Sequence, residues 1–416
     1  MTHKSQGRKD VEDRYHLDYP EEVMKEVTNT IITSDLSQGD PRVYGMCTYS
    51  LAEILFIIFC GTICGLVSYV DFADFAQEQL SWLRQYMPYK NGVPSHDTIR
   101  RIMNLMNPKV VMEYSRSLIR ELEKSCNTNN ENVIEEPPKQ VCGHIVIDGK
   151  TVKGHDLERT RLLHSVSAYD VENGISLEQI TTRLDNGKEV GEYQCTLQLL
   201  DLLELKNKVL SGDAGLCYDE IAQKIVGGHG YYIFTLKENQ PTLYSEVKYA
   251  FIKLFPYQKE QSLCLEESGK GHGRIENRRY YVLSSADNLP DTITFSGLKS
   301  IIMVERERTY KGVTTLTTHY YVSNMQVSDG IEISHCIRAH WRIENSLHHV
   351  LDVTFREDDT RARDPYGVEN MLIFRRLALS LLNQFKGKQT VPRLMLKALL
   401  NPDYRSNIIK KLIIDA

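Results

Sequence analysis

The chain of 416 residues lacks several features that would assign it to a class at once. Its nine cysteines include no CxxC pair, which argues against a zinc ribbon and favours reduced thiols in a cytoplasmic-type compartment. The 50 lysines and arginines nearly balance the 55 aspartates and glutamates, so any nucleic-acid binding must rest on local patches. The opening MTHKSQGRKDVEDRYH has no apolar core of the kind found in signal peptides.

Long apolar runs are scarce, with one exception. Residues 54–70, ILFIIFCGTICGLVSYV, are about as long as the shortest membrane span. Two glycines interrupt the run, no basic cluster flanks it, and the acidic Glu53 and Asp71 border it. We therefore predict a buried pair of helices here and no membrane span.

Helical periodicity dominates the first third of the chain. After a polar tail at 1–25, residues 26–125 repeat their apolar positions as helices do. The stretch 126–141 is polar, acidic and contains prolines, so it is predicted to be a linker. An all-α N-terminal domain is therefore expected, followed by a separate second domain.

One short helix in that domain carries paired arginines. In VPSHDTIRRIMNLM, Pro94 and Ser95 mark a helix start, and Arg100 and Arg101 project from its first turns. The pattern suits a DNA-binding helix-turn-helix, and it equally suits a solvated helix face. The sequence leaves both alternatives open.

The pattern after the linker changes to short β-branched runs. HIVIDGKTVKG, LLHSVSAYD and ISLEQITTR predict three strands in succession, followed by helix, strand (KVLSGDAG), helix and strand (YYIFTLK). This is the order of a ribonuclease H-like α/β domain. Asp148 is expected at or near the C-terminal end of the first strand, and Asp213 at the end of the fourth.

The catalytic domain is predicted to span 142–390. Alternating patterns at about 240–330, such as RRYYVLSSA and KSIIMVERERTY, predict a mostly β insertion. VENMLIFRRLALSLLNQF is predicted to be an amphipathic helix, and 391–416 a C-terminal tail. The predicted fold class is α/β: a ribonuclease H-like catalytic core with a mostly β insertion, preceded by an all-α domain.

Three carboxylates stand out as candidates for chemistry: Asp148, Asp213 and Glu344. Alone, each aspartate is more often a turn residue. If the three converge, they repel one another, by about 4 kcal/mol for two charges roughly 4 Å apart at an effective dielectric near 20. A divalent cation would relieve that repulsion, and carboxylate oxygens favour Mg²⁺ or Mn²⁺.

The surroundings of Glu344 allow a second interpretation. In HWRIENSLHHVLDVTF, His340, Glu344 and His348 fall at i, i+4 and i+8, close to one face of a helix, so a zinc site is one alternative. In the other, Glu344 acts with the distant aspartates, and each histidine contacts phosphate or is simply a hydrogen-bonded helix residue.

Several of these segments together resemble a known family. IDGKTVKG, SGDAG, YIFTLKENQPTL, GHGRIENRR and HWRIENSLHHVLDVTFREDDTRAR resemble the H-repeat-associated branch of the DDE transposases, which bacterial insertion sequences encode. DPRVYGMCTYSLAEIL and VPSHDTIRRIM are similar to the helical domain that accompanies that catalytic domain. The resemblance extends from about Asp40 to Phe385.

The resemblance implies a function and its parts. It implies cleavage and joining of DNA at transposon ends, with Asp148, Asp213 and Glu344 as the catalytic, metal-binding carboxylates for Mg²⁺ or Mn²⁺. It also implies double-stranded DNA as partner (terminal inverted repeats and target), a homo-oligomer on DNA, and a place at the nucleoid in the cytoplasm. The alternatives are a catalytically inactive DNA-binding relic and a metal-dependent nuclease without strand transfer.

The chain departs from related transposases at three positions. Where a tyrosine, arginine and lysine often accompany the glutamate, this sequence has Ile337, His340 and Leu351. No hairpin-forming cleavage and no base-flipping role is therefore assigned to those residues. Hydrolysis at a 3′ transposon end, then attack of the 3′-hydroxyl on target DNA, is the expected sequence.

DNA phosphates are expected to meet lysines and arginines. GKGHGRIENRR is the best patch, because its glycines allow close backbone approach beside three arginines. No phosphate-loop spacing occurs, so no nucleotide cofactor is predicted. The predicted DNA-binding residues are Arg100, Arg101, Lys150, Lys153, Lys237, Arg274, Arg278, Arg279 and Arg342.

Overall fold

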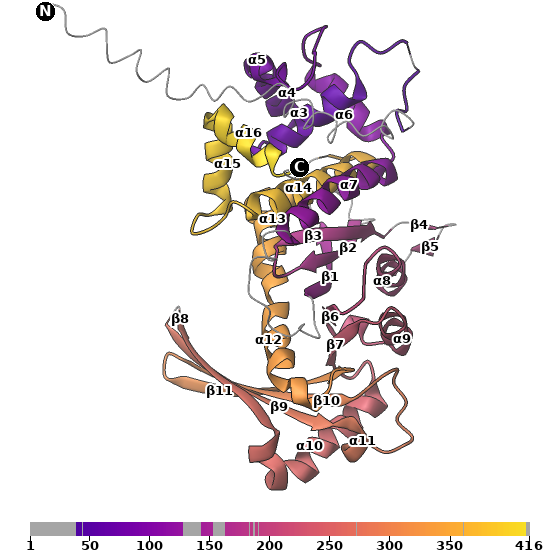
Figure 1. Ribbon diagram of the computed structural model, residues 1–416, viewed down its shortest axis with the longest axis vertical. Helices are drawn as coiled ribbons and strands as arrows, with labels where there is room; N and C mark the ends of the chain where they lie inside the picture. Colours follow the sequence, from indigo (N-terminus) through magenta and orange to yellow (C-terminus); the bar gives the residue numbers. More distant parts are fainter. Residues whose placement is uncertain are drawn as a thin grey trace, which may run out of the picture.

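A nine-stranded sheet runs through the computed structural model, in the order β3-β2-β1-β6-β7-β11-β10-β9-β8 (Figure 1). The structure describes residues 39–43, 45–127, 143–152, 163–182, 184–185, 188–189, 191–271, 273–360 and 362–412. The predicted tail at 1–25 and nearly all of the predicted linker lie outside these residues. The sheet strands are β1 (His144–Val152), β2 (Leu163–Asp170), β3 (Ile175–Thr181), β6 (Val209–Gly212), β7 (Tyr231–Leu236), β8 (Leu263–Gly271), β9 (Arg274–Ser284), β10 (Ser300–Tyr310) and β11 (Val313–Ser323).

The first half of the sheet mixes antiparallel and parallel strands. β1 pairs antiparallel with β2, and β2 with β3, whereas β1, β6 and β7 run parallel to one another. The crossovers to β6 and β7 contain helices α8 (Glu192–Leu200) and α9 (Asp219–Gly227), with the small hairpin β4 (Leu184–Asp185) and β5 (Lys188–Glu189) before α8. The five strands and two helices predicted for this part of the chain are confirmed.

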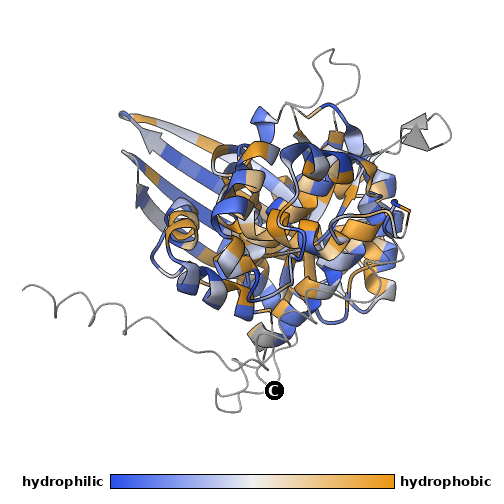
Figure 2. Ribbon diagram, turned by 90° about the horizontal axis from the view of Figure 1, so that it is seen from above, coloured by the Kyte–Doolittle hydropathy of each residue, from blue (hydrophilic) through white to orange (hydrophobic). Residues whose placement is uncertain are grey.

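The predicted insertion extends the same sheet. β11 pairs antiparallel with β7, and β10, β9 and β8 follow outward as antiparallel neighbours. The segment also contains helices that its alternating pattern did not predict, α10 (Pro241–Ser262) and α11 (Ser285–Asn288). The first seven residues of β11 are exposed, and Figure 2 shows this end of the sheet as largely hydrophilic.

The N-terminal helices form the other end of the molecule. They are α3 (Leu51–Ile63), α4 (Tyr69–Glu78), α5 (Leu80–Leu83), α6 (His96–Leu105) and α7 (Pro108–Asn127). Ser50 and Glu53 form a reciprocal capping box at the start of α3, whose side chains are almost all buried. Of the pair of buried helices predicted at 54–70, only α3 is found there; the second helix, α4, begins at Tyr69, and Val70 is exposed. Within the residues that the structure describes, none of the helices has the length and hydropathy of a membrane span.

Helix α14 (Pro365–Asn383) joins these helices to the sheet. It packs against α3, α6 and α7 on one side and against β3 on another. Its Asn370 amide is buried and donates to the carbonyls of Met103 (2.8 Å) and Met106 (3.0 Å) at the end of α6. The prediction of an amphipathic helix here is wrong, because α14 is covered on nearly all sides.

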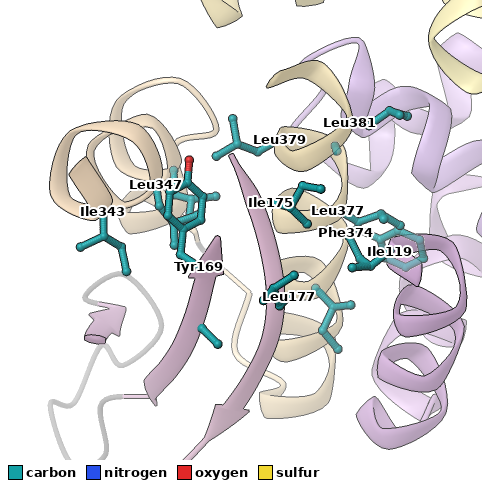
Figure 3. Close-up of a cluster of buried hydrophobic side chains, with 14 of the residues drawn as sticks. Ile119, Tyr169, Ile175, Leu177, Ile343, Leu347, Phe374, Leu377, Leu379 and Leu381 are labelled. Atoms are coloured by element: carbon teal, nitrogen blue, oxygen red, sulfur yellow. The ribbon is translucent and has the colours of Figure 1, made fainter. Parts of the chain in front are cut away.

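One apolar core therefore spans the helices and the sheet. Figure 3 shows Phe374 and Leu377 of α14 beside Ile119 of α7 and Leu177 of β3. The chain continues beyond α14 into α15 (Val391–Leu400) and α16 (Pro402–Lys410), helices that were not among the predicted elements of the C-terminal tail.

The segment before α14 is built from short helical pieces. η4 (Val327–Asp329) and α12 (Gly330–His340) lead to a π-helical turn, η5 (Glu344–His348), then α13 (His349–Val353) and η6 (Glu357–Asp359). Ile343, Leu347 and Leu351 are buried here and belong to the apolar core. The remaining described helix, η3 (Ala214–Leu216), follows β6 directly.

Candidate functional site

Two neighbouring parallel strands place Asp148 and Asp213 side by side. The last pairs between β1 and β6 are Ser211 with Val146 and Gly212 with Ile147, so the two aspartates follow at the same level of the sheet. Asp148 was expected at or near the C-terminal end of the first strand, but it lies in the middle of β1. The strand continues to Val152 because β2 still pairs with it there, whereas β6 stops at Gly212.

Asp213 ends its strand by starting a helix. Its Oδ1 accepts a hydrogen bond of 2.7 Å from the Gly215 N–H, which caps η3. The Asp213 side chain is exposed, and its charge is among those that raise the pKa of Asp148. This aspartate is therefore both a turn residue and a charged neighbour of Asp148.

Glu344 comes from the π-helical turn. The His349 N–H bonds to the Glu344 carbonyl, one residue beyond the α-helical spacing. Such turns insert an extra residue into a helix and are frequent at functional sites. The turn interrupts the regular helix that the apolar pattern predicted, and it leaves the Glu344 side chain 54% exposed above β1.

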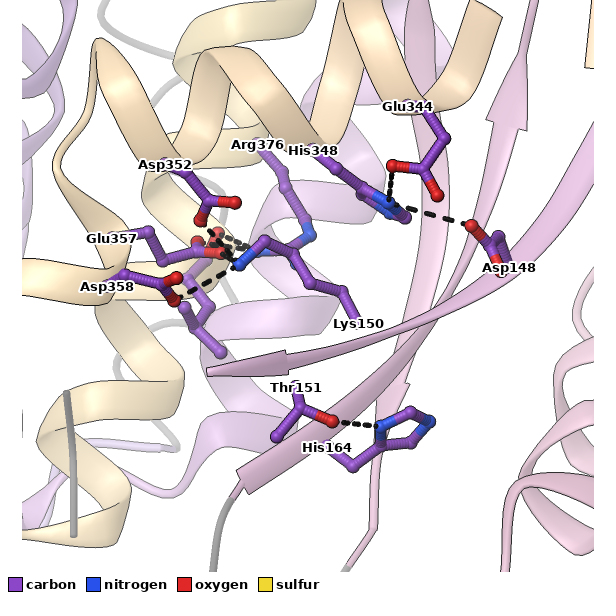
Figure 4. Close-up of polar contacts among 11 residues, drawn as sticks. Asp148, Lys150, Thr151, His164, Glu344, His348, Asp352, Glu357, Asp358 and Arg376 are labelled. Atoms are coloured by element: carbon purple, nitrogen blue, oxygen red, sulfur yellow. Dashed lines mark hydrogen bonds and ion pairs between the residues drawn. The ribbon is translucent and has the colours of Figure 1, made fainter. Parts of the chain in front are cut away.

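His348 lies between the two acids. Its Nδ1 is 3.6 Å from Asp148 Oδ2 and 3.6 Å from Glu344 Oε2, and its side chain is only 7% exposed (Figure 4). Its Nε2 is buried and has no hydrogen-bond partner within the described part of the chain. The alternative of a simple hydrogen-bonded helix residue is therefore wrong for His348.

His340 has a different environment. Its Nδ1 lies 2.9 Å from the Ser211 hydroxyl, which is also 2.7 Å from His144 Nε2. His340 is thus hydrogen-bonded to Ser211 of β6. Among the described residues, the side chains placed so that they could hold one metal ion together are Asp148, Glu344 and His348, and His340 is not one of them. The i, i+4, i+8 zinc alternative does not form.

The environment of Asp148 disfavours its ionised form. Burial raises the pKa of Asp148 to about 7, and the charges of Glu344 and Asp213 contribute, while the Gly149 N–H opposes the shift. Burial lowers the pKa of His348 to about 4, and the positive charges of Arg376 and Lys150 contribute to this shift, so the ring is neutral at neutral pH.

The donor set fits a divalent cation. One atom from each of Asp148, Glu344 and His348 lies within 4.8 Å of the others. Two carboxylates and a neutral imidazole are ordinary ligands of divalent metals. A positive ion between them would offset the burial and the repulsion from Glu344 that together raise the pKa of Asp148.

Lys150 anchors β1 to the segment that follows Glu344. Its Nζ lies 2.6 Å from Asp352, 3.2 Å from Glu357 and 3.5 Å from Asp358, and its side chain is 7% exposed. Arg376 of α14 bonds to the fully buried Glu357 at 3.1 Å (Figure 4). The prediction of Lys150 as a DNA contact is corrected, because three carboxylates surround its ammonium group.

The other predicted DNA-binding residues are spread over the surface. Lys237, Arg342 and Arg101 are exposed; Arg100 pairs with Asp97 at 2.9 Å on α6, and Arg279 pairs with Glu266 at 2.8 Å. Lys153 lies outside the described residues. Arg274 and Arg278 converge with residues that sequence reasoning missed.

These two arginines line a pocket of about 300 Å³ between β9, β10, β11 and α12. Arg306 of β10 faces Arg278 in the sheet register, and Arg338 and Trp341 come from the end of α12. Glu276 accepts from Arg306 (2.7 Å) and also pairs with Arg274 (3.2 Å) and Arg278, so three guanidinium groups share one carboxylate and positive charge is in excess.

Trp341 adds an exposed aromatic side chain to the pocket lined by the arginines. Its side chain is 58% exposed, three residues before Glu344, and it lines the arginine pocket together with Asn345. Alternating arginines in RIENRRYYVL and MVERERTY were the available signal in the sequence. Their convergence depends on the pairing of β9 with β10, which the sequence alone did not give.

Comparison with known proteins identifies relatives along most of the chain. A family model described as "Transposase DDE domain" matches residues 142–381, and one described as "DDE_Tnp_1-associated" matches residues 37–118. "Putative transposase YncI" of Escherichia coli O157:H7 is 31% identical over 89% of this chain and 92% of its own length. "H repeat-associated putative transposase YhhI" of Escherichia coli (strain K12) is 30% identical over 87% and 92%.

Among solved structures, a cryo-EM structure of the piggyBac transposase synaptic complex with hairpin DNA covers 95% of this chain and 80% of that chain. The sequence identity is 12% and the TM-score 0.39. At that distance the likeness supports no inference about this molecule.

Replacement of Lys150 tests the buried ion-pair network. In Lys150→Met, Asp352, Glu357 and Asp358 lose their shared cation, so the free energy of unfolding should fall by about 3–5 kcal/mol in urea denaturation. Lys224→Met is the matched control, because Lys224 pairs with the exposed Asp201 at 2.7 Å and should cost less than about 1 kcal/mol. A Lys150 variant as stable as the control would contradict this role.

The raised pKa of Asp148 predicts a pH-dependent stability in metal-free protein. The folded state holds this proton up to about pH 7, whereas the unfolded state releases it near 3.8, so ionised Asp148 destabilises the fold increasingly as pH rises. Asp148→Asn should therefore stabilise the protein in EDTA by about 2 kcal/mol more at pH 8 than at pH 5. Asp201→Asn, at an exposed position, is the control for the substitution itself. An equal effect of Asp148→Asn at pH 5 and at pH 8 would contradict the prediction.

Proposed function

The chain belongs to the DDE transposase family, and on that premise we propose that it cuts DNA at transposon ends and joins the freed 3′-hydroxyl to target DNA. The observation that supports the proposal most strongly is the convergence of acids from distant parts of the chain. Asp148 and Asp213 share one level of the sheet. Glu344, from the π turn, brings a carboxylate oxygen within 4.8 Å of one from Asp148.

We further propose that the core is ribonuclease H-like. The order β3-β2-β1-β6-β7, with three antiparallel strands followed by two parallel ones, supports this assignment. The domain division proposed with it has a helical region at 26–125, a linker at 126–141 and a catalytic domain at 142–390 with its insertion at about 240–330. The segment 1–25 would precede these domains. The predicted C-terminal tail at 391–416 is corrected, because α15 packs against α3 and α14 and both α15 and α16 contribute to the apolar core.

The carboxylates Asp148, Asp213 and Glu344 would hold the divalent cation, Mg²⁺ or Mn²⁺. When bound, such an ion supplies polarisation of the scissile phosphate and stabilisation of the charge that develops on it. Asp148 pairs with Ser167 of β2 and directly follows Ile147, the last residue of β1 that also pairs with β6, so its backbone is fixed within the sheet. Glu344 and Asp213 are exposed and face the side from which DNA can approach.

The reaction would proceed in two displacements at phosphorus. Water attacks the phosphodiester at the transposon end, and the 3′-oxygen leaves and takes up a proton as a 3′-hydroxyl. That hydroxyl then attacks a phosphodiester of the target, a new P–O bond forms, and the target's own 3′-oxygen leaves. No hairpin step is proposed. The tyrosine, arginine and lysine that often accompany the glutamate in related transposases are replaced here by Ile337, His340 and Leu351.

DNA would follow the basic surface beside the acids. Arg342 and Lys237 are exposed near the strand ends, and the arginine pocket lies along α12 toward Glu344. Trp341 offers an exposed aromatic surface in the same place. A protein that holds two DNA ends requires at least two protomers, so a homo-oligomer acting at the nucleoid in the cytoplasm belongs to the proposal.

The cleavage reaction tests the proposed function. Asp148→Asn, Asp213→Asn and Glu344→Gln should each abolish cleavage and strand transfer on cognate terminal repeats with Mg²⁺ or Mn²⁺, while DNA binding persists. Asp201→Asn and Glu332→Gln remove exposed charges of the same types elsewhere and should leave both steps intact. Binding without any cleavage by the unaltered protein would indicate an inactive relic, and cleavage without joined products a nuclease.

The arginine pocket is tested by the salt dependence of DNA binding. Arg338→Ala should weaken binding and reduce the slope of log K against log salt by about 1, because one phosphate contact releases about one counterion. Arg393→Ala, an exposed arginine on α15, is the control and should leave the slope unchanged. An unchanged slope for Arg338→Ala would remove this pocket from the DNA path.

A further inference from the structure

We propose that His348 is a ligand of the cation that Asp148 and Glu344 hold, and that it makes the site select Mn²⁺ over Mg²⁺. The inference rests on the proposed function, since it concerns the same metal site. It adds a nitrogen donor to a set that the family resemblance describes only by its carboxylates.

The position of the imidazole carries the inference. His348 Nδ1 lies 3.6 Å from one oxygen of each acid, too far for a hydrogen bond to either. Two ligands of one ion, each bonded at roughly 2.0–2.2 Å, lie about 3.0–3.6 Å apart, so the observed separation suits atoms that share a cation. The three donor atoms lie within 4.8 Å of one another.

The burial of His348 supports a built site. The side chain is 7% exposed, and the buried Nε2 has no hydrogen-bond partner within the described residues, so no hydrogen bond to the protein accounts for its orientation. The neighbouring Leu347 is fully buried and fixes the π turn against the sheet. The ring is therefore fixed by the backbone and aimed at the two acids from inside the molecule.

Ligand chemistry then gives the selectivity. Mg²⁺ prefers oxygen donors in octahedral geometry, whereas imidazole nitrogen suits transition metals better. Mn²⁺ accepts both kinds of donor, and its divalent charge still offsets the repulsion between Asp148 and Glu344. A mixed site of two carboxylates and one imidazole should thus bind Mn²⁺ more tightly than Mg²⁺.

Electron spin resonance of bound Mn²⁺ tests this without any activity measurement. Mn²⁺ added to the full-length protein should show electron spin echo modulation from a directly bound ¹⁴N nucleus. His348→Asn, which places an amide oxygen near the position of Nδ1, should remove that modulation. The neighbouring exposed His349→Asn is the control and should retain it.

Calorimetric titration with Mn²⁺ and Mg²⁺ supplies the second measurement. His348→Asn should lower the Mn²⁺ affinity by about tenfold or more while changing the Mg²⁺ affinity little, so that the preference disappears. Bound Mn²⁺ without nitrogen modulation in the unaltered protein would overturn the inference even if the variant failed to fold. If Asp148→Asn abolishes Mn²⁺ binding but His348→Asn does not affect it, the proposed metal site stands and His348 is not a ligand. Absence of Mn²⁺ binding to the unaltered protein would overturn both.

Discussion

Repulsion between carboxylates is the constraint on which the rest of this structure depends. Asp148 and Asp213 lie at one level of the sheet, and Glu344 comes within 4.8 Å of Asp148 from a distant part of the chain. Burial, together with the charges of Glu344 and Asp213, raises the pKa of Asp148 to about 7. Two such charges roughly 4 Å apart cost about 4 kcal/mol at an effective dielectric near 20. The fold holds them in place through the register of β1 with β6 and through the π turn at Glu344. The architecture resembles a site that is completed by a cation.

Buried ion pairs connect β1, which carries Asp148, to the segment that follows Glu344. Lys150, two residues after Asp148 on β1, binds carboxylates on α13 and η6, and Arg376 of α14 binds the same buried Glu357. α14 in turn packs on the N-terminal helices and on β3. One apolar core therefore includes the N-terminal helices, α14 and the sheet.

Much of this fold was predictable from the sequence, and the reasons for the exceptions are physical. β-branched runs predicted β1, β2, β3, β6 and β7 but not the small hairpin of β4 and β5. Their order is that of a ribonuclease H-like domain, in which the ends of the first and fourth strands carry acids. The π turn at Glu344 was not predictable, because it departs from the periodicity by which helices are recognised. The role of Lys150 depends on partners about 200 residues away, and that of His348 on the rotation that the π turn imposes. The arginine pocket depends on how β9 pairs with β10, a register that residue patterns do not specify.

The claim that the three acids share metal is tested most directly by anomalous diffraction from crystals of the protein containing Mn²⁺. The account predicts an anomalous peak within about 2.5 Å of oxygens from Asp148 and Glu344, with Asp213 as a ligand of the same ion or of a second ion beside it. Manganese bound only elsewhere, or Asp213 still bonded to the Gly215 N–H and remote from every ion, would contradict it.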